Sequence, residues 1–158
     1  SVMRCSAYRE VGGYDPRLFL GAEEALLSLD LATRGWAMVY ADDVVTRHWP
    51  SRARDPSARQ VAVLRNRLWI AGLRLPWRIA WYETRRALRD ADAAQALRGL
   101  AQALAGMPWV LGERRPVPAS VWRMWWQVHG RVGSAQARWG SRARDVGRPS
   151  KSSHWWFS

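Results

Sequence analysis

The net charge of the chain changes abruptly at a proline, and a step of this size indicates a boundary between two kinds of structure. Residues 1–50 carry five arginines against seven acids, a net charge of −2, whereas residues 51–158 carry 20 cations against six acids, a net charge of +14. The step falls at Pro50, and the next six residues include a serine, an aspartate and a second proline. We therefore predict a boundary here, between a neutral front of mixed pattern and a basic back.

The cysteine content and the hydropathy pattern exclude two kinds of structure. A single cysteine, Cys5, allows neither an internal disulfide nor a zinc site built on cysteines. Apolar runs such as 68–73 are short, and a membrane span needs about 20 apolar residues, so no segment is predicted to cross a bilayer. No signal peptide is visible, and the opening Ser1–Arg4 is typical of the middle of a domain, so we expect the chain to begin partway through a longer protein.

The front predicts two helices followed by two strands. Gly12 and Gly13 end a short first helix, and a wide apolar face predicts a second helix at about 23–33, with Asp30 and Arg34 able to pair on its outer face. Apolar residues in 36–41 and 44–48, separated by two aspartates, predict two β-strands. The expected fold class is therefore α/β in the front and mostly α-helical in the back.

The back predicts helices separated by proline and glycine. Apolar residues recur at helical spacing in 56–75, 77–90 and 92–105, and Pro118 can open a further helix. The first segment places Val61, Leu64, Leu68, Ala71 and Leu75 on one face. In the second, Trp77, Trp81 and Leu88 lie on the face other than the one with the arginines. In the third, Ala93, Leu97, Leu100, Ala101 and Leu104 are expected to point inward. We divide the chain into residues 1–50, a basic helical region at 51–129, and a tail at 130–158 that is predicted to be disordered.

An ordered series of motifs in the front resembles family 2 glycosyltransferases. The matching segments are Met3-Arg4, Tyr8–Asp15, Leu18–Leu29, Gly35-Trp36, Val39-Tyr40, Val44-Val45 and His48. The resemblance covers roughly residues 2–50 and implies the acceptor half of a GT-A fold, with an incomplete sheet. The family's donor half, with its Asp-x-Asp motif, has no counterpart in this sequence, since Asp90-Ala91-Asp92 lies in a helical stretch. The resemblance thus implies a chain that is inactive by itself.

The resemblance implies roles for several residues. Glu24 would be the general base that takes the proton from the attacking hydroxyl, with Glu23 as its neighbour, and a helix start favours such anions. Gly12, Gly13 and Asp15 would contact the acceptor. On residue chemistry alone, the two acids could equally be helix-capping residues and the two glycines a helix stop.

Two further residues would serve the donor side. His48 would complete the site of a divalent ion, Mg or Mn, since imidazole is a good ligand for such ions, although it could also be a solvated strand-end histidine. Arg65, in the pair Arg65-Asn66, would contact the donor diphosphate, although it could also be a solvated arginine. No metal is expected on this chain alone, because one ligand cannot hold an ion.

Three partners are open for the basic region. Residues 77–90 place Arg78, Arg85 and Arg89 on one face with Tyr82 between them, a composition typical of a helix at an anionic membrane surface. Nucleic acid would also accept arginine and aromatic residues. The alternative function is a basic, tryptophan-rich binding module for an anionic membrane surface or nucleic acid, but such a module would not need Gly12-Gly13, the acid pair and His48 in family order. The third alternative is packing on a missing catalytic half. In the parent enzyme the partners would be a nucleotide sugar and a glycan or lipid-linked acceptor, at the inner face of the cell membrane.

Overall fold

A computed structural model describes residues 2–39, 41, 44, 45, 47 and 56–127 of the chain. The chain divides into two units, Ser1–Val117 and Pro118–Ser158. In the described part of the first unit the helices are α1 (Cys5–Glu10), the 3-10 turn η1 (Pro16–Leu18), α2 (Glu23–Thr33), α3 (Pro56–Arg74), α4 (Trp77–Asp90), α5 (Ala93–Ala105) and α6 (Met107–Gly112). In the second unit residues 119–127 are helical.

The long helices lie where the sequence predicts them. α2 has the predicted bounds, and α3, α4 and α5 agree with the predicted segments to within about a residue at each end. Asp92 caps α5, its carboxylate accepting from the backbone N–H of Gln95 at 2.8 Å. The helix after Pro118 is confirmed, whereas the sequence does not predict α6, since Gly106 and Pro108 follow the third predicted segment. Pro108 lies in the first turn of α6, where proline costs no hydrogen bond.

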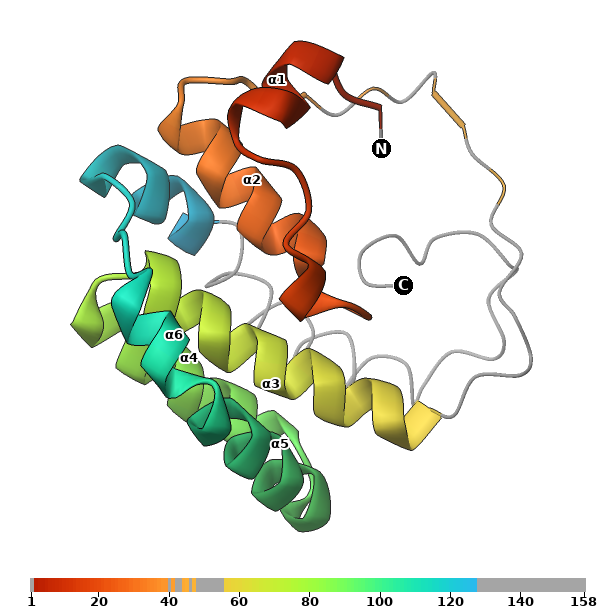
Figure 1. Cartoon of the computed structure of the whole chain (residues 1–158), viewed down its shortest axis with the longest axis vertical. Helices are drawn as coiled ribbons and strands as arrows, with labels where there is room; N and C mark the ends of the chain where they lie inside the picture. The colour runs from red at the N-terminus through yellow and green to blue at the C-terminus, as the bar shows by residue number, and fades with distance from the viewer. Residues whose placement is uncertain (1, 40, 42–43, 46, 48–55, 128–158) are drawn as a thin grey trace, which may run out of the picture. The chain divides into compact units, whose positions relative to one another are not determined.

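α3 is the central helix of the first unit. α2, α4, α5 and α6 all pack on it (Figure 1). The five residues predicted to share its apolar face, Val61, Leu64, Leu68, Ala71 and Leu75, are all buried. Trp69, Ile70 and Leu73 are buried as well, because helices cover α3 on more than one side. α3 is therefore the core helix around which the other helices of the unit pack.

Glycines let α5 and α6 approach α3 closely. A Cβ added at Gly99 would lie 2.6 Å from the Leu64 side chain, and one added at Gly106 would lie 2.6 Å from the Trp69 ring. The indole of Trp69 is fixed, because its Nε1 donates to the carbonyl of Ala103 at 2.9 Å and its ring meets Trp109 edge-on at 5.3 Å. The junction between α5 and α6 therefore leaves no room for a side chain at Gly106.

This close approach gives a stability prediction. Gly106→Ala is expected to lower the free energy of unfolding by about 1–3 kcal/mol, the usual cost of overpacking. Gly106 has φ −89°, so alanine brings no backbone strain and the loss is steric. The matched control is Gly112→Ala, where an added Cβ meets nothing within 4 Å. Equal urea midpoints for the two variants would show that the ring of Trp69 is not held in place.

The segment after α6 completes the carboxyl end of α3. The backbone N–H of Arg115 donates to the carbonyl of Leu73 at 2.9 Å, and that of Val117 to the carbonyl of Arg74 at 2.8 Å. The Arg114 guanidinium donates to the carbonyls of Gly72 and Leu75. These bonds satisfy the carbonyls that a helix end leaves without partners, so residues 114–117 terminate α3.

The predicted α/β front is wrong. No residue that the structure describes is in a β-strand, including those at 36–39, 41, 44, 45 and 47 within the two predicted strands. Met38, Val39, Val44 and Val45 are exposed there. A pair of strands is only marginally stable unless further strands or a helix cover its apolar face. These exposed side chains have no such cover. The partial GT-A sheet is therefore not part of this structure.

Three packing predictions are also wrong. Trp77 and Trp81 of α4 are exposed together with Arg78, Arg85 and Arg89 instead of lying on a separate face. Ala93, Leu97, Ala101 and Leu104 of α5 are exposed instead of inward. The faces that meet α3 carry small residues, Ala80 and Ala87 on α4 and Gly99 and Ala103 on α5, because close helix approach excludes large side chains. Asp30 pairs with Arg74 of α3, its Oδ2 accepting from Nη2 at 3.0 Å, instead of with Arg34. The predicted disordered tail, 130–158, lies outside the described residues.

Candidate functional site

A loop between α1 and α2 is fixed to α3 by one buried amide. The side chain of Asn66 is fully buried, and its Nδ2 donates to the carbonyl of Leu18 at 3.1 Å and to that of Gly21 at 2.6 Å. Its Oδ1 accepts from Nε and Nη2 of Arg65 at 3.0 and 2.9 Å. Both donors and both acceptor positions of the amide are thus used. Leu18 is itself fully buried, so Asn66 determines the path of the chain that enters α2.

The backbone of this loop is strained. Leu20 has φ 75° and Ala22 has φ 67°, the only positive values among the described residues other than glycine. Such a conformation costs of order 1–3 kcal/mol and persists only where the surroundings impose it. The bonds from Asn66 flank Leu20, and Ala22 immediately precedes α2. The strain is therefore stored at the entry to α2.

A second anchor holds the start of the loop. Arg17 donates through Nη1 and Nη2 to the two carboxylate oxygens of Glu113, both at 2.7 Å, and its guanidinium lies 4.0 Å from the ring centroid of Trp109. It also pairs with Asp15 at 2.8 Å. Burial alone would raise the pKa of Asp15, but the hydrogen bonds from Arg17 outweigh it and the pKa is lowered. The loop is thus held at both ends.

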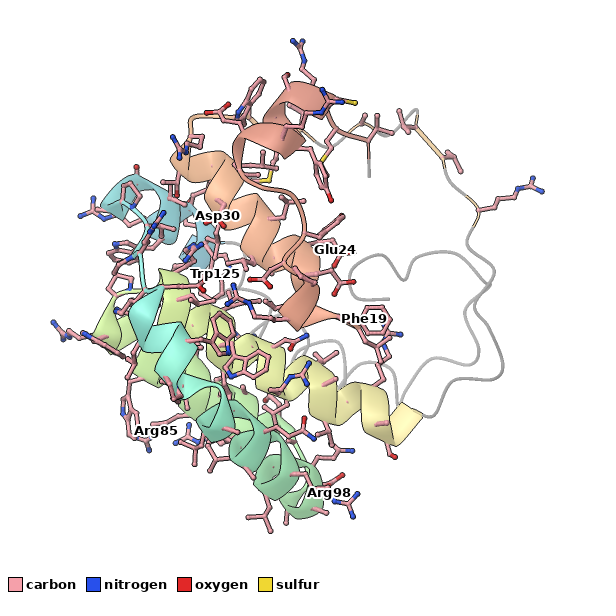
Figure 2. The ribbon with its side chains drawn as sticks, in the orientation of Figure 1. Phe19, Glu24, Asp30, Arg85, Arg98 and Trp125 are labelled. Atoms are coloured by element: carbon pink, nitrogen blue, oxygen red, sulfur yellow. The ribbon has the colours of Figure 1, made fainter. Side chains whose placement is uncertain are left out.

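The two predicted acids form the first turn of α2, directly after the strained loop. Glu24 is exposed, whereas Glu23 is partly buried and its Oε2 is buried with no hydrogen-bond partner in the described part of the chain. Figure 2 shows Glu24 and the exposed side chain of Phe19 at the same end of α2. The accessible carboxylate is therefore that of Glu24, which can accept a proton from an incoming molecule.

Arg65 is brought to the same loop through Asn66. Its guanidinium binds the Asn66 amide and lies 4.5 Å from the ring centroid of Trp69. Burial lowers the pKa of Arg65 from its ordinary value, but an arginine stays protonated at neutral pH. The structure thus links Arg65, through Asn66, to the loop that leads into Glu23 and Glu24, and the roles of the three residues stay predictions.

Gly12, Gly13 and Asp15 each have a structural role within the chain. Gly12 and Gly13 have φ 85° and 75°, and a Cβ on Gly13 would lie 2.7 Å from the ring of Tyr8. The backbone N–H of Arg17 donates to Asp15 Oδ1 at 2.9 Å, so Asp15 caps η1. These contacts explain the three residue types structurally. Their acceptor contacts stay predictions.

The predicted metal ligand His48 lies outside the described residues. Among the residues that are described, no group of three or more His, Cys, Asp or Glu side chains could hold a metal ion. The same residues include no helix long and apolar enough to cross a membrane.

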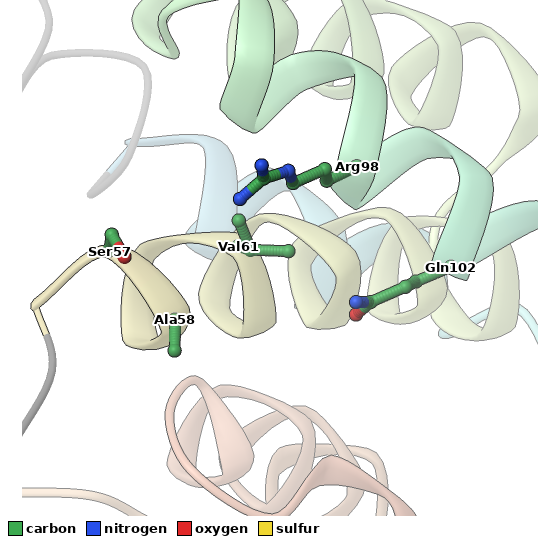
Figure 3. Close-up of a pocket in the computed structure, with 5 residues that line it drawn as sticks. All are labelled: Ser57, Ala58, Val61, Arg98 and Gln102. Atoms are coloured by element: carbon green, nitrogen blue, oxygen red, sulfur yellow. The ribbon is translucent and has the colours of Figure 1, made fainter.

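One depression of the surface lies away from the acids. It has a volume of about 240 Å³ and is lined by Ser57, Ala58, Val61, Arg98 and Gln102, from α3 and α5 (Figure 3). None of the predicted site residues lines it. A depression of this kind offers one exposed guanidinium and one amide, which is not a set of groups that performs a reaction.

Asn66 is the residue of this site whose role the sequence did not reveal. The resemblance gives the pair Arg65-Asn66 a role only through its arginine, as a donor contact. The signal in the sequence is an amide within the otherwise apolar and basic run 61–74, since a buried amide needs partners. Its partners could not be identified, because they lie 45 and 48 residues away.

The comparisons with known proteins add no relative. No protein-family model, no curated protein and no solved structure matches the chain.

Proposed function

We propose that residues 1–50 serve the acceptor side of a glycosyltransferase, with Glu24 as the general base. The observation that carries the proposal is the strained loop Phe19–Ala22, which Asn66 pins to α3 and which leads directly into the two acids. Strained backbone concentrates at functional sites, where it positions groups for chemistry. The series of motifs that resembles family 2 glycosyltransferases includes the same loop and the same acids.

The reaction places few demands on this segment. Glu24 takes the proton of an acceptor hydroxyl, the oxygen bonds to the anomeric carbon of the donor sugar, and the bond from that carbon to the nucleotide diphosphate breaks. The base needs an accessible carboxylate, and Glu24 offers one in the first turn of α2. The exposed ring of Phe19, which Figure 2 shows at the same end of α2, offers an apolar face on which a sugar ring can lie. The donor would be held mainly by the family's Asp-x-Asp half, which this sequence lacks, with Arg65 contacting the diphosphate and His48 completing the metal site.

The test is a transfer assay on the natural gene product that contains these residues. Nucleotide diphosphate sugars carrying labelled hexoses or pentoses are offered with membrane-lipid and cell-wall glycan extracts as acceptors. Transfer of label to an acceptor, lost in the Glu24→Gln variant, supports the proposal. A gene product that transfers no sugar from any donor in the set, while folded by circular dichroism, contradicts it.

A binding experiment on the 158-residue chain tests whether this chain binds the sugar donor. Because no Asp-x-Asp motif precedes the acids, nucleotide diphosphate sugars with Mn²⁺ are expected not to bind measurably by calorimetry. The Asp90-Ala91-Asp92 sequence is no substitute, because Asp90 ends α4 and Asp92 caps α5. Micromolar affinity would mean that the chain holds the donor itself, and the assignment of the donor to other residues would fail.

A further inference from the structure

α4 presents an exposed face of arginines and aromatic residues. Trp77, Trp81 and Tyr82 are exposed, and so are Arg78, Arg85 and Arg89. At 100° per residue, these six side chains fall within a sector of about 140° of the helix. The opposite side of the helix, with Ala80, Glu83 and Ala87, is buried. We call the six exposed residues the α4 face.

The charge of the α4 face is not cancelled by acids of its own helix. Glu83 is buried on the opposite side, where burial raises the pKa of its carboxyl group against the opposing effect of Arg86 and Arg67. Asp90 lies 3.8 Å from Arg67 of α3, also away from the face. The α4 face is therefore a cationic surface with large exposed rings, and it would attract an anionic partner.

The arrangement of the rings favours a lipid surface over nucleic acid. The guanidinium of Arg114 lies 3.7 Å from the ring centroid of Trp77, and that of Arg85 lies 6.0 Å from the centroid of Trp81. A base stacking on these rings would have to compete with the guanidinium groups. At a bilayer surface the same pairs are compatible with binding, because the rings enter the interfacial layer while the arginines meet the phosphates.

We propose that the α4 face docks the chain on an anionic lipid bilayer. The α4 face is independent of the proposed function, because it contains no residue of the loop Phe19–Ala22 and Figure 2 shows Arg85 well separated from Glu24. A face of one helix gives reversible, peripheral binding, with arginines 78, 85 and 89 supplying the electrostatic attraction and Trp77, Trp81 and Tyr82 the apolar contact.

The experiment is co-sedimentation of the full 158-residue chain with vesicles. One set contains phosphatidylcholine alone and the other equal parts of phosphatidylcholine and phosphatidylglycerol. We expect binding to the anionic set that declines as salt rises, because exposed charges are screened. The triple variant Arg78→Gln, Arg85→Gln, Arg89→Gln is expected to bind about 100-fold more weakly. Trp81→Ser is expected to weaken binding at both low and high salt.

A matched control separates the α4 face from the net charge of the chain. Arg9→Gln, Arg34→Gln, Arg98→Gln removes three exposed arginines from α1, the end of α2 and α5, and leaves the same net charge as the α4 triple. It is expected to bind nearly as tightly as the unaltered chain. Equal losses in the two triples, or equal binding to neutral and anionic vesicles, would overturn the proposal.

A third arm addresses nucleic acid. Anisotropy of a labelled single-stranded 20-mer is followed with the chain and both triples, all checked for the same thermal unfolding. If the α4 triple loses its affinity for the oligonucleotide and keeps its affinity for anionic vesicles, the α4 face is a nucleic-acid surface and the proposal is overturned.

Discussion

Replacing Asn66 with alanine is expected to lower the free energy of unfolding by about 2–4 kcal/mol. The variant removes both donors that the carbonyls of Leu18 and Gly21 use, and each buried polar group left without a partner costs about 1–3 kcal/mol. It also leaves a cavity where a fully buried side chain stood. Urea unfolding followed by circular dichroism at 222 nm measures the change.

Two further variants identify the cause. Asn66→Asp keeps the shape but cannot donate to the two carbonyls, so it is expected to destabilise at least as much as alanine at neutral pH. Gln60→Ala, on the exposed side of the same helix, removes an exposed hydrogen bond to Gln95 and is expected to change stability by less than about 0.5 kcal/mol. If the Asn66→Asp variant is as stable as the unaltered chain, the hydrogen bonds from Asn66 to the loop do not contribute to the stability of the chain.

The helices could be predicted because their signals are local. A start at Glu23, a proline at 76 and a cap at Asp92 are each visible within a few residues of the helix that they bound. The inward faces of α4 and α5 could not be predicted in the same way. Counting apolar residues selects Leu97 and Leu104, whereas the distance of closest approach to α3 selects Gly99 and Ala103, and that distance is a property of the packed pair.

The formation of strands and the fixing of the loop Phe19–Ala22 by Asn66 both depend on residues that are distant in the sequence. Strand signals at 36–41 and 44–48 predict β-structure only where partners cover them, and the described residues there are exposed. The acids at 23 and 24 could be singled out by their place in a motif. The sequence could not predict that α3 holds the loop in front of these acids. The bond that does so joins Asn66 to Gly21, which lies 45 residues earlier in the chain.

The predicted base gives the largest expected effect. In the natural gene product, Glu24→Gln is expected to lower kcat by about 10²- to 10⁴-fold, the usual cost of a lost general base. Glutamine keeps the size and hydrogen bonding of glutamate but cannot take the proton. Because Glu24 is exposed at the first turn of α2, the substitution is expected to leave the unfolding midpoint nearly unchanged. Initial rates at saturating donor and acceptor measure the effect, and the KM for the donor is expected to stay the same.

Glu23→Gln separates the base from its neighbour. Glu23 stands in the same turn, but its Oε2 is buried, so it is less able to meet an acceptor hydroxyl and its loss is expected to cost much less in kcat. If Glu23→Gln is the inactive variant and Glu24→Gln retains most activity, the base is Glu23. If both variants keep their activity, the two acids act only as first-turn anions that stabilise α2, and the assignment of a general base to this loop is wrong.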